Sequence, residues 1–510
     1  IKTKAITEPS GEATAEMIRR ALGSERGPVA DQQDAHANEP TAAEIAAART
    51  KAIGWLVAQQ NQDGGWGQGE ESRHMQRGNG QHEMRDPSNV GDTAASVLAL
   101  LRTGSTPLGA IHKLGLMEQP QVDRLEAILR GLDYLLAAVE AHESNDLYIT
   151  DLRGTRLQSK LGPYVDTFLT AVTLTEALDH EPEDAHRARI TAALEKIVDK
   201  IEANQRADGG FGGGGWANAL SVSLSNQALN GAVLRGIAVE EEVLGRTQQA
   251  AAGSDAVVGG RFAARGDSAG IELYAAAKAV SGTAANDVAL RESVAVSAPQ
   301  MQAVALEAGR VADALERDGE SARAEELRRA SAELVVVADG SELDDDSARK
   351  QADAAGVLRQ AMDDASVADA WDRVAGEVVP ATTVASRLDM YNDTNARFRE
   401  NAFALVQTRG AVVSRLQDQR FVAGFGSDGG EEYLSYMKIG EGLAADADAE
   451  EALGHFVKAM RGNLARVQNN DGSWTGHHCI TGRNFCTATA LMVMTLDEWA
   501  VGHDHGRGEG

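Results

Sequence analysis

Apolar residues recur at helical spacing along much of the chain, and the first clear helix begins after Thr41. Glu44 lies three residues beyond Thr41, which is the spacing of a capping box. The apolar positions continue from Ile45 to Val57 and lead into the segment Gln60-Asn-Gln-Asp63-Gly64-Gly65-Trp66. An Asp-Gly-Gly segment does not continue a helix, and its glycines permit the positive φ of a tight turn. The pattern predicts a helix that ends in a glycine turn with a buried aromatic ring.

A second helix follows each such turn in the predicted unit. After the polar loop 68–89, Asp92 and Thr93 are typical of a helix start and predict a helix over 94–102. Asp166 and Thr167 have the same placement before the apolar run 168–178. The unit is therefore a helix, a glycine turn, a loop and a second helix.

The unit recurs, and its signature is Gln-x-x-Asp-Gly-small-aromatic. The three clear copies comprise Gln60, Asp63 and Trp66, then Gln205, Asp208 and Phe211, and finally Gln468, Asp471 and Trp474. A degenerate copy lies at 419–430. One helical hairpin cannot bury its apolar face alone, so the hairpins must stack on one another.

The pattern changes between about residues 240 and 380, where long stretches rich in Ala and charge lack the turn signature. Val311, Leu315, Leu327 and Leu334 keep helical spacing, so we expect a charged helical insertion. The predicted organisation is a loosely ordered arm (1–42), a first repeat part (43–240), the insertion (241–381), a last repeat part (382–500) and a disordered tail (501–510). The two histidines of that tail suggest either a solvated segment or a metal ligand.

The repeat resembles the QW motif of squalene–hopene cyclases and the related repeats of protein prenyltransferase β subunits. The resemblance covers roughly 43–240 and 382–500 and implies an all-α fold, an α/α toroid with inner and outer rings of helices around a central cavity. It also implies structural roles for the repeated Gln, Asp and aromatic residues, with Gln bonding a neighbouring helix end. The motif is specific for the fold, whereas the reaction depends on the site.

The catalytic residues of these families do not carry over to the chain. The nearest match to the acidic motif of triterpene cyclases is Glu342-Leu-Asp344-Asp345-Asp346, inside the charged insertion, where solvent keeps carboxylates ionised. Aligned on the zinc-binding Asp-x-Cys segment of prenyltransferases, the chain has Glu432 for the acid and Leu434 for the cysteine, and Cys486 takes the place of the histidine. Leucine cannot bind zinc. The α subunit that prenyltransferases require is also no part of this chain.

The densest group of reactive side chains is His477, His478, Cys479 and Cys486. Histidine and cysteine are zinc ligands, so zinc is one candidate cofactor, although Cys-x₆-Cys is longer than the usual two- to four-residue knuckle. The alternatives are a Cys479–Cys486 disulfide, two structural thiols, or a nucleophile whose pKa is lowered at the helix start near Thr487.

Loops before inner helices of a toroid border the cavity mouth, so the resemblance places several further residues near one rim. These cavity-rim candidates are Asp92, Asp166, Glu431, Glu432, Tyr433 and Arg483, and His477 and His478 are expected at the same rim. Helix capping is the competing interpretation for Asp92 and Asp166, and the helix dipole explains Glu431 and Glu432 equally well.

Composition limits the partners. The formal net charge of −27 disfavours phosphate backbones, so no nucleic acid is expected, and no apolar run approaches the roughly 18–20 residues of a transmembrane segment. The chain starts at Ile1 without a signal-peptide pattern, which leaves both a cytoplasmic protein and an exported, trimmed one open.

Two functions remain from the sequence. In the first, which we prefer because the catalytic signatures are missing, the toroid is a binding or structural scaffold whose insertion contacts another protein chain or a second copy. In the second, the chain is an atypical enzyme that holds an isoprenoid-like or other apolar small molecule in its cavity, with metal assistance from the His477/His478/Cys479/Cys486 group. The low aromatic content, 4 %, argues against a terpene cyclase, whose cations need π faces.

Overall fold

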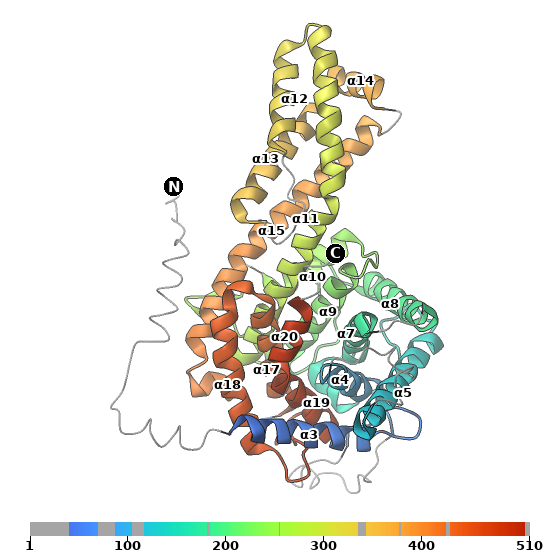
Figure 1. The fold of residues 1–510 in the computed structure, drawn as a ribbon, viewed down its shortest axis with the longest axis vertical. Coiled ribbons are helices and arrows are strands. Elements are labelled where there is room, and N and C mark those ends of the chain that lie inside the picture. Colours follow the sequence, from blue (N-terminus) through green and yellow to red (C-terminus); the bar gives the residue numbers. More distant parts are fainter. Residues whose placement is uncertain are drawn as a thin grey trace, which may run out of the picture. The chain divides into compact units, whose positions relative to one another are not determined.

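The computed structural model describes residues 40–69, 87–104, 117–180, 184–253, 255–334, 343–376, 379–424 and 429–504. Within these ranges the regular structure is almost wholly helical, with one short hairpin of β1 (Val257–Val258) and β2 (Arg261–Phe262) (Figure 1). The all-α prediction is confirmed. None of the described helices is both long enough and apolar enough to cross a membrane.

The chain divides into two compact units. The first comprises the described parts of 1–285 and 406–510, and the second is Asn286–Leu405. The first unit holds α3 (Ala42–Ala58), α4 (Val90–Leu101), α5 (Gln119–Ala141), α6 (Arg156–Leu161), α7 (Val165–His180), α8 (Asp184–Asn204), α9 (Asn218–Val233), α10 (Glu241–Ala252), η2 (Gly266–Ser268), α16 (Gln419–Val422), α17 (Gly430–Ala445), η4 (Ala447–Ala449), α18 (Glu450–Val467), α19 (Arg483–Met494) and α20 (Leu496–Asp504).

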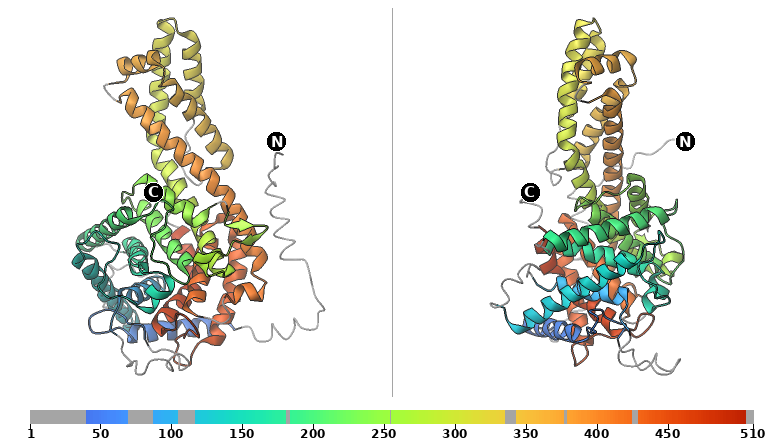
Figure 2. Two further views of the ribbon diagram at one scale, coloured as in Figure 1. Left: turned by 180° about the vertical axis from the view of Figure 1, so that it is seen from behind. Right: turned by 90° about the vertical axis from the view of Figure 1, so that its right-hand side faces the viewer.

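The second unit contains α12 (Ser321–Glu333), α13 (Asp345–Ala361) and α14 (Ala365–Val374), together with parts of α11 (Glu272–Arg317) and α15 (Ala381–Arg415). Its long yellow and orange helices run lengthwise beside one another in both views of Figure 2. It has a hydrophobic core of its own, whose aromatic side chains are Trp371, Tyr391 and Phe398. The insertion is therefore a separately packed helical unit.

The second unit does not have the bounds that the sequence predicted. It spans 286–405 rather than 241–381, because α10 belongs to the first unit and both unit boundaries fall inside the continuous helices α11 and α15. A boundary within a helix leaves no turn residues in the sequence. Of the predicted tail 501–510, residues 501–504 belong to α20 and the rest lie outside the described residues, as does most of the arm 1–42.

Two kinds of helix build the first unit. All twelve residues of α4 are buried, and α7, α9, α17 and α19 bury most of theirs, as expected of helices whose residues are mostly apolar or small on every side; α7 and α17 also bury charged residues. By contrast, α3 buries only Ala48, Ala52 and Leu56, a single stripe. Among the buried helices α4 contacts α7 and α19, α9 contacts α7 and α17, and α17 contacts α19.

The repeated turn has the same geometry in each clear copy. Gly64, Gly209 and Gly472 have φ of +88°, +74° and +98°. In each copy the Asp carboxylate accepts a hydrogen bond from the backbone N–H two residues later, at 3.0–3.1 Å. Such Asx geometry with a left-handed glycine is a local property of the sequence.

The repeated Gln joins each turn to a neighbouring helix. Nε2 of Gln60 donates to the carbonyl of Ala127 in α5 (2.8 Å), that of Gln205 to Val243 in α10 (3.0 Å), and that of Gln468 to Ala48 in α3 (2.9 Å). The resemblance implied a bond to a helix end. Ala48 and Ala127 instead lie within their helices.

The aromatic residue closes the unit. Nε1 of Trp66 donates to the carbonyl of Leu56, and Nε1 of Trp474 to that of Leu464, each ten residues earlier. Both rings are completely buried. The third aromatic, Phe211, is partly buried and packs against Phe168 with ring centroids 4.8 Å apart.

The predicted helix starts at Asp92 and Asp166 were wrong. Helix α4 begins at Val90 with Asn89 as its N-cap, whose side chain accepts from the Asp92 N–H at 2.9 Å. Helix α7 begins at Val165. Both Asp residues therefore lie inside the first helical turn, because each helix begins at a residue before the Asp, at Val90 in α4 and at Val165 in α7. In the insertion, Asp344 is the N-cap of α13.

Candidate functional site

The candidate site lies at the N-terminal turn of α17 and in the loop that precedes α19. Glu431 has no exposed surface, and its Oε2 accepts a hydrogen bond from the Ile480 N–H at 3.1 Å. Its Oε1 is buried and has no hydrogen-bond partner among the described residues. A buried carboxylate oxygen without a partner is rare in native proteins and calls for a physical explanation.

Two residues of the loop face this carboxylate. One carboxylate oxygen of Glu431, one ring nitrogen of His478 and Sγ of Cys479 all lie within 4.8 Å of one another. The three atoms differ in chemistry but all are ligands that zinc accepts. The structure thus combines two residues of the predicted metal group with an acid that was predicted only for the rim.

Glu432 lies behind this group and orients it. Its Oε2 is 3.3 Å from Nε2 of His478 and accepts from the Gly429 N–H at 3.0 Å. Its Oε1 accepts from the Tyr274 hydroxyl at 2.6 Å. Gly429 lets the loop approach, since a Cβ at that position would lie 2.9 Å from the His478 carbonyl oxygen. The Glu432 carboxylate therefore orients the His478 ring, and the Tyr274 hydroxyl and the Gly429 N–H hold that carboxylate in place.

The backbone at Cys479 is unusual. Its φ is +51°, one of two positive values among the described non-glycine residues. A side chain costs free energy in the left-handed region, and such residues persist where the surroundings over-determine them, often at functional sites.

Without a bound metal, the surroundings of both cysteines disfavour the thiolate. Burial and the adjacent Glu431 carboxylate raise the pKa of Cys479 to about 11. Burial also raises the pKa of Cys486, so the lowered pKa that the sequence suggested for this thiol was wrong. Desolvation outweighs the helix terminus here, because the Cys486 side chain is fully buried and its Sγ donates to the Ile480 carbonyl at 3.6 Å. Both cysteines are free thiols rather than a disulfide.

The acid at the centre of the site is also perturbed. Burial, together with the neighbouring Glu432 carboxylate, raises the pKa of Glu431 to about 7, against the effect of its backbone hydrogen bonds. Burial likewise raises the pKa of Asp166 to about 6, despite a hydrogen bond from Gln158 Nε2 at 2.6 Å. Both carboxyls lie in first turns of buried helices.

The other predicted residues take different places. His477 is exposed and lies outside the group of three. Arg483 donates to Ser473 and Asp471 of the third repeat turn, so it stabilises that turn. Tyr433 is buried in the hydrophobic core, and Asp92 is held by the Asn89 side-chain amide at 2.7 Å.

Comparison with family models, with curated proteins and with solved structures gave no match to the chain.

A buried charge cluster, absent from the predictions, lies elsewhere in the same unit. Arg102 donates to Glu176 from Nε (2.9 and 3.0 Å) and to Glu441 from Nη1 (2.5 Å). Lys438 completes the cluster, 2.8 Å from Glu441. Trp499 donates to Glu176 at 3.0 Å, and Arg102 lies 4.7 Å from the centroid of the Trp499 ring.

The cluster and the candidate site are at different levels of the unit. Glu431 and Glu441 are ten residues apart on α17, which is about 15 Å along a helix axis. Burial would raise the pKa of Glu441, but Lys438 and Arg102 lower it to about 2. All four charges are nearly inaccessible, and their formal sum is zero.

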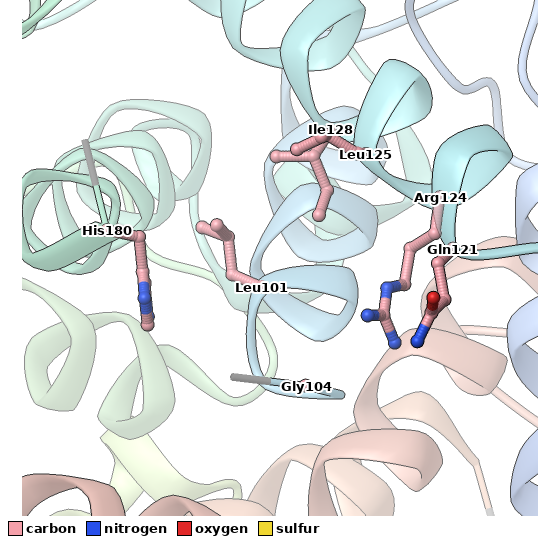
Figure 3. A pocket seen from close by; sticks show the side chains of 7 residues that line it. All are labelled: Leu101, Gly104, Gln121, Arg124, Leu125, Ile128 and His180. Carbon is pink, nitrogen blue, oxygen red and sulfur yellow. The ribbon is translucent and has the colours of Figure 1, made fainter. Parts of the chain in front are cut away.

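A signal for this cluster exists in the sequence, namely single charges within otherwise apolar helices. A small hollow elsewhere, of about 10 Å³, contains none of the candidate residues (Figure 3). Its lining consists of Leu101, Gly104, Gln121, Arg124, Leu125, Ile128 and His180.

Proposed function

We propose that the chain is an atypical α/α toroid of the terpenoid cyclase and prenyltransferase type that acts as a binding or structural scaffold. Three repeat turns with matching hydrogen bonds support this fold. So does the sequence of contacts among buried helices, which runs from α4 through α7, α9, α17 and α19 back to α4. The Gln468 bond to Ala48 links the last repeat to α3, the first of the described helices. Such contacts suit an array that closes on itself.

The observation that carries the scaffold role is the filling of the interior. The buried helices α4, α7, α9, α17 and α19 leave few residues accessible, and all of α4 and fourteen residues of α17 are buried. A cavity large enough for an isoprenoid would leave its lining accessible to water. The buried ion cluster also occupies interior volume. An apolar ligand placed beside it could not offer the hydrogen bonds or opposite charges that buried charges need.

The second unit supplies the contact surface in this proposal. Apolar side chains are exposed on two of its helices, Val296 and Leu306 on α11 and Met390 and Phe403 on α15, with exposures of 53–70 %. Scattered single apolar residues are normal, but several on one helical unit suit contact with another protein chain or a second copy.

The test is product analysis with the full chain. Squalene and a prenyl diphosphate are incubated with the protein, with and without added Zn²⁺, and the extracts are analysed by mass spectrometry. The scaffold role predicts no product above a heat-denatured control. Turnover that requires the folded chain would contradict it.

One observation favours the second candidate function, a metal-assisted enzyme. Glu431, His478 and Cys479 would leave a coordination position open if they held a metal, and open positions are the mark of catalytic rather than structural zinc. Product formed only with Zn²⁺, and lost in a Cys479→Ser variant, would select this function over the scaffold.

A further inference from the structure

We propose that Glu431, His478 and Cys479 bind one Zn²⁺ ion and leave its fourth position open to a small oxygen or nitrogen ligand. This site is independent of the scaffold role, since a scaffold with zinc and an enzyme with zinc both contain it. It also differs from the group that the sequence suggested, because His477 and Cys486 are not among the ligands.

The donor set selects the metal. Thiolate and imidazole are soft or borderline ligands that suit zinc, whereas calcium and magnesium prefer oxygen alone. Tetrahedral zinc with bonds of about 2.0–2.3 Å separates its ligand atoms by roughly 3.3–3.6 Å. The three atoms here lie within 4.8 Å of one another, so shifts of the side-chain atoms by about an ångström would bring them to tetrahedral spacing around one ion.

A second observation points to a ligand at the same place. Glu431 is completely buried, and its Oε1 has no hydrogen-bond partner among the described residues. A metal ion satisfies such an oxygen, and its charge compensates the neighbouring Glu432 carboxylate.

The surroundings match those of a metal-bound histidine. Such a histidine usually presents its other ring nitrogen to a carboxylate, which fixes the tautomer and orientation of the ring. Nε2 of His478 lies 3.3 Å from Glu432 Oε2, so Nδ1 is the nitrogen assigned to the metal. Tyr274 and the Gly429 N–H hold Glu432 in place. Glu432 is thus a positioning residue.

The experiment uses the full chain and two metals. The protein is treated with chelator, dialysed and titrated with Co²⁺, then with Zn²⁺ in competition. We expect one ion per chain and a thiolate-to-cobalt charge-transfer band that Zn²⁺ abolishes. Cys479→Ser should remove the band, whereas the matched control Cys486→Ser should keep it. His478→Ala should weaken binding and His477→Ala should not.

Glu432→Gln tests the positioning role. It should lower the metal affinity about 10–100-fold while the charge-transfer band persists, because the thiolate ligand remains. An unchanged affinity would overturn that role.

A further measurement covers variants that do not fold. In the unsubstituted chain, Zn²⁺ should slow alkylation of Cys479 by iodoacetamide, as read from the peptide masses. No stoichiometric binding, a band that survives Cys479→Ser, or alkylation of Cys479 at an unchanged rate would each overturn the site. Zinc binding without turnover leaves the scaffold role intact, and zinc-free turnover overturns only that role.

Discussion

Removal of the Arg102 guanidinium should destabilise the protein strongly. Arg102 has a side chain only 1 % exposed and donates to two carboxylates, Glu176 and Glu441. In Arg102→Met, Glu441 keeps Lys438 and Glu176 keeps the Trp499 N–H, but the guanidinium charge is gone, so the buried cluster changes from a formal charge of zero to −1. Breaking a buried pair by removing one partner costs about 3–5 kcal/mol. We expect a loss in that range for the free energy of unfolding.

The assay is urea unfolding followed by tryptophan fluorescence, since Trp499 lies beside Arg102. The matched control is Arg189→Met, because Arg189 is 36 % exposed and also binds two acids. That control should cost no more than about 1 kcal/mol.

A double variant separates charge from packing. Arg102→Met combined with Glu441→Gln leaves Glu176 and Lys438, whose charges cancel. If uncompensated charge causes the loss, the double variant should be more stable than Arg102→Met alone. If Arg102→Met lowers the free energy of unfolding no more than Arg189→Met does, the buried cluster does not stabilise the protein as proposed. If the double variant is less stable than Arg102→Met alone, the loss comes from packing rather than from charge.

Three further outcomes are expected. Because burial raises the pKa of Asp166 to about 6, the stabilisation from its protonated form is complete below about pH 4 and is lost as the pH rises through 6. Asp166→Asn should therefore flatten the pH profile of thermal unfolding and raise stability at pH 7.5 by up to about 3 kcal/mol, and an unchanged profile would count against it. Gly64→Ala should lower the free energy of unfolding by more than about 1 kcal/mol, since the φ of Gly64 is +88° and a Cβ would lie 2.5 Å from the Arg130 carbonyl oxygen. The control Gly54→Ala, which has no atom near the new Cβ, should be neutral or stabilising by about 0.5–1 kcal/mol in the same melts. Glu441 has a lowered pKa of about 2, so its contribution to the free energy of unfolding is present above about pH 4.5 and is lost as the pH falls toward 2. In acid unfolding, the stability of Glu441→Gln should therefore depend less steeply on pH over that window.

The repeat was predictable because its chemistry is local. Gly64, Gly209 and Gly472 have a left-handed backbone, and the Asp before each one accepts a hydrogen bond within the turn. The residues of the signature therefore form the turn by themselves, without contacts from distant parts of the chain. Helix starts were less predictable. Gly91 is accommodated inside α4, and the cap is Asn89 rather than Asp92.

The candidate site was predictable only in part. His478 and Cys479 are neighbours in the sequence, whereas Glu431 lies 47 residues before His478 and reaches it only through the packing of α17 against α19. The same holds for Arg102, whose partners Glu176 and Glu441 are 74 and 339 residues away. Pairings at such separations depend on the closure of the fold, which no local pattern encodes.

The most direct test of the proposed scaffold is an electron-density map of the zinc-loaded full chain, measured at the zinc absorption edge. We expect α19 packed against α4, an interior occupied by side chains with Arg102, Glu176, Lys438 and Glu441 in contact, and one anomalous peak between Glu431, His478 and Cys479. An open array with its first and last repeats apart, or a closed array around an empty apolar cavity, would contradict the proposed scaffold.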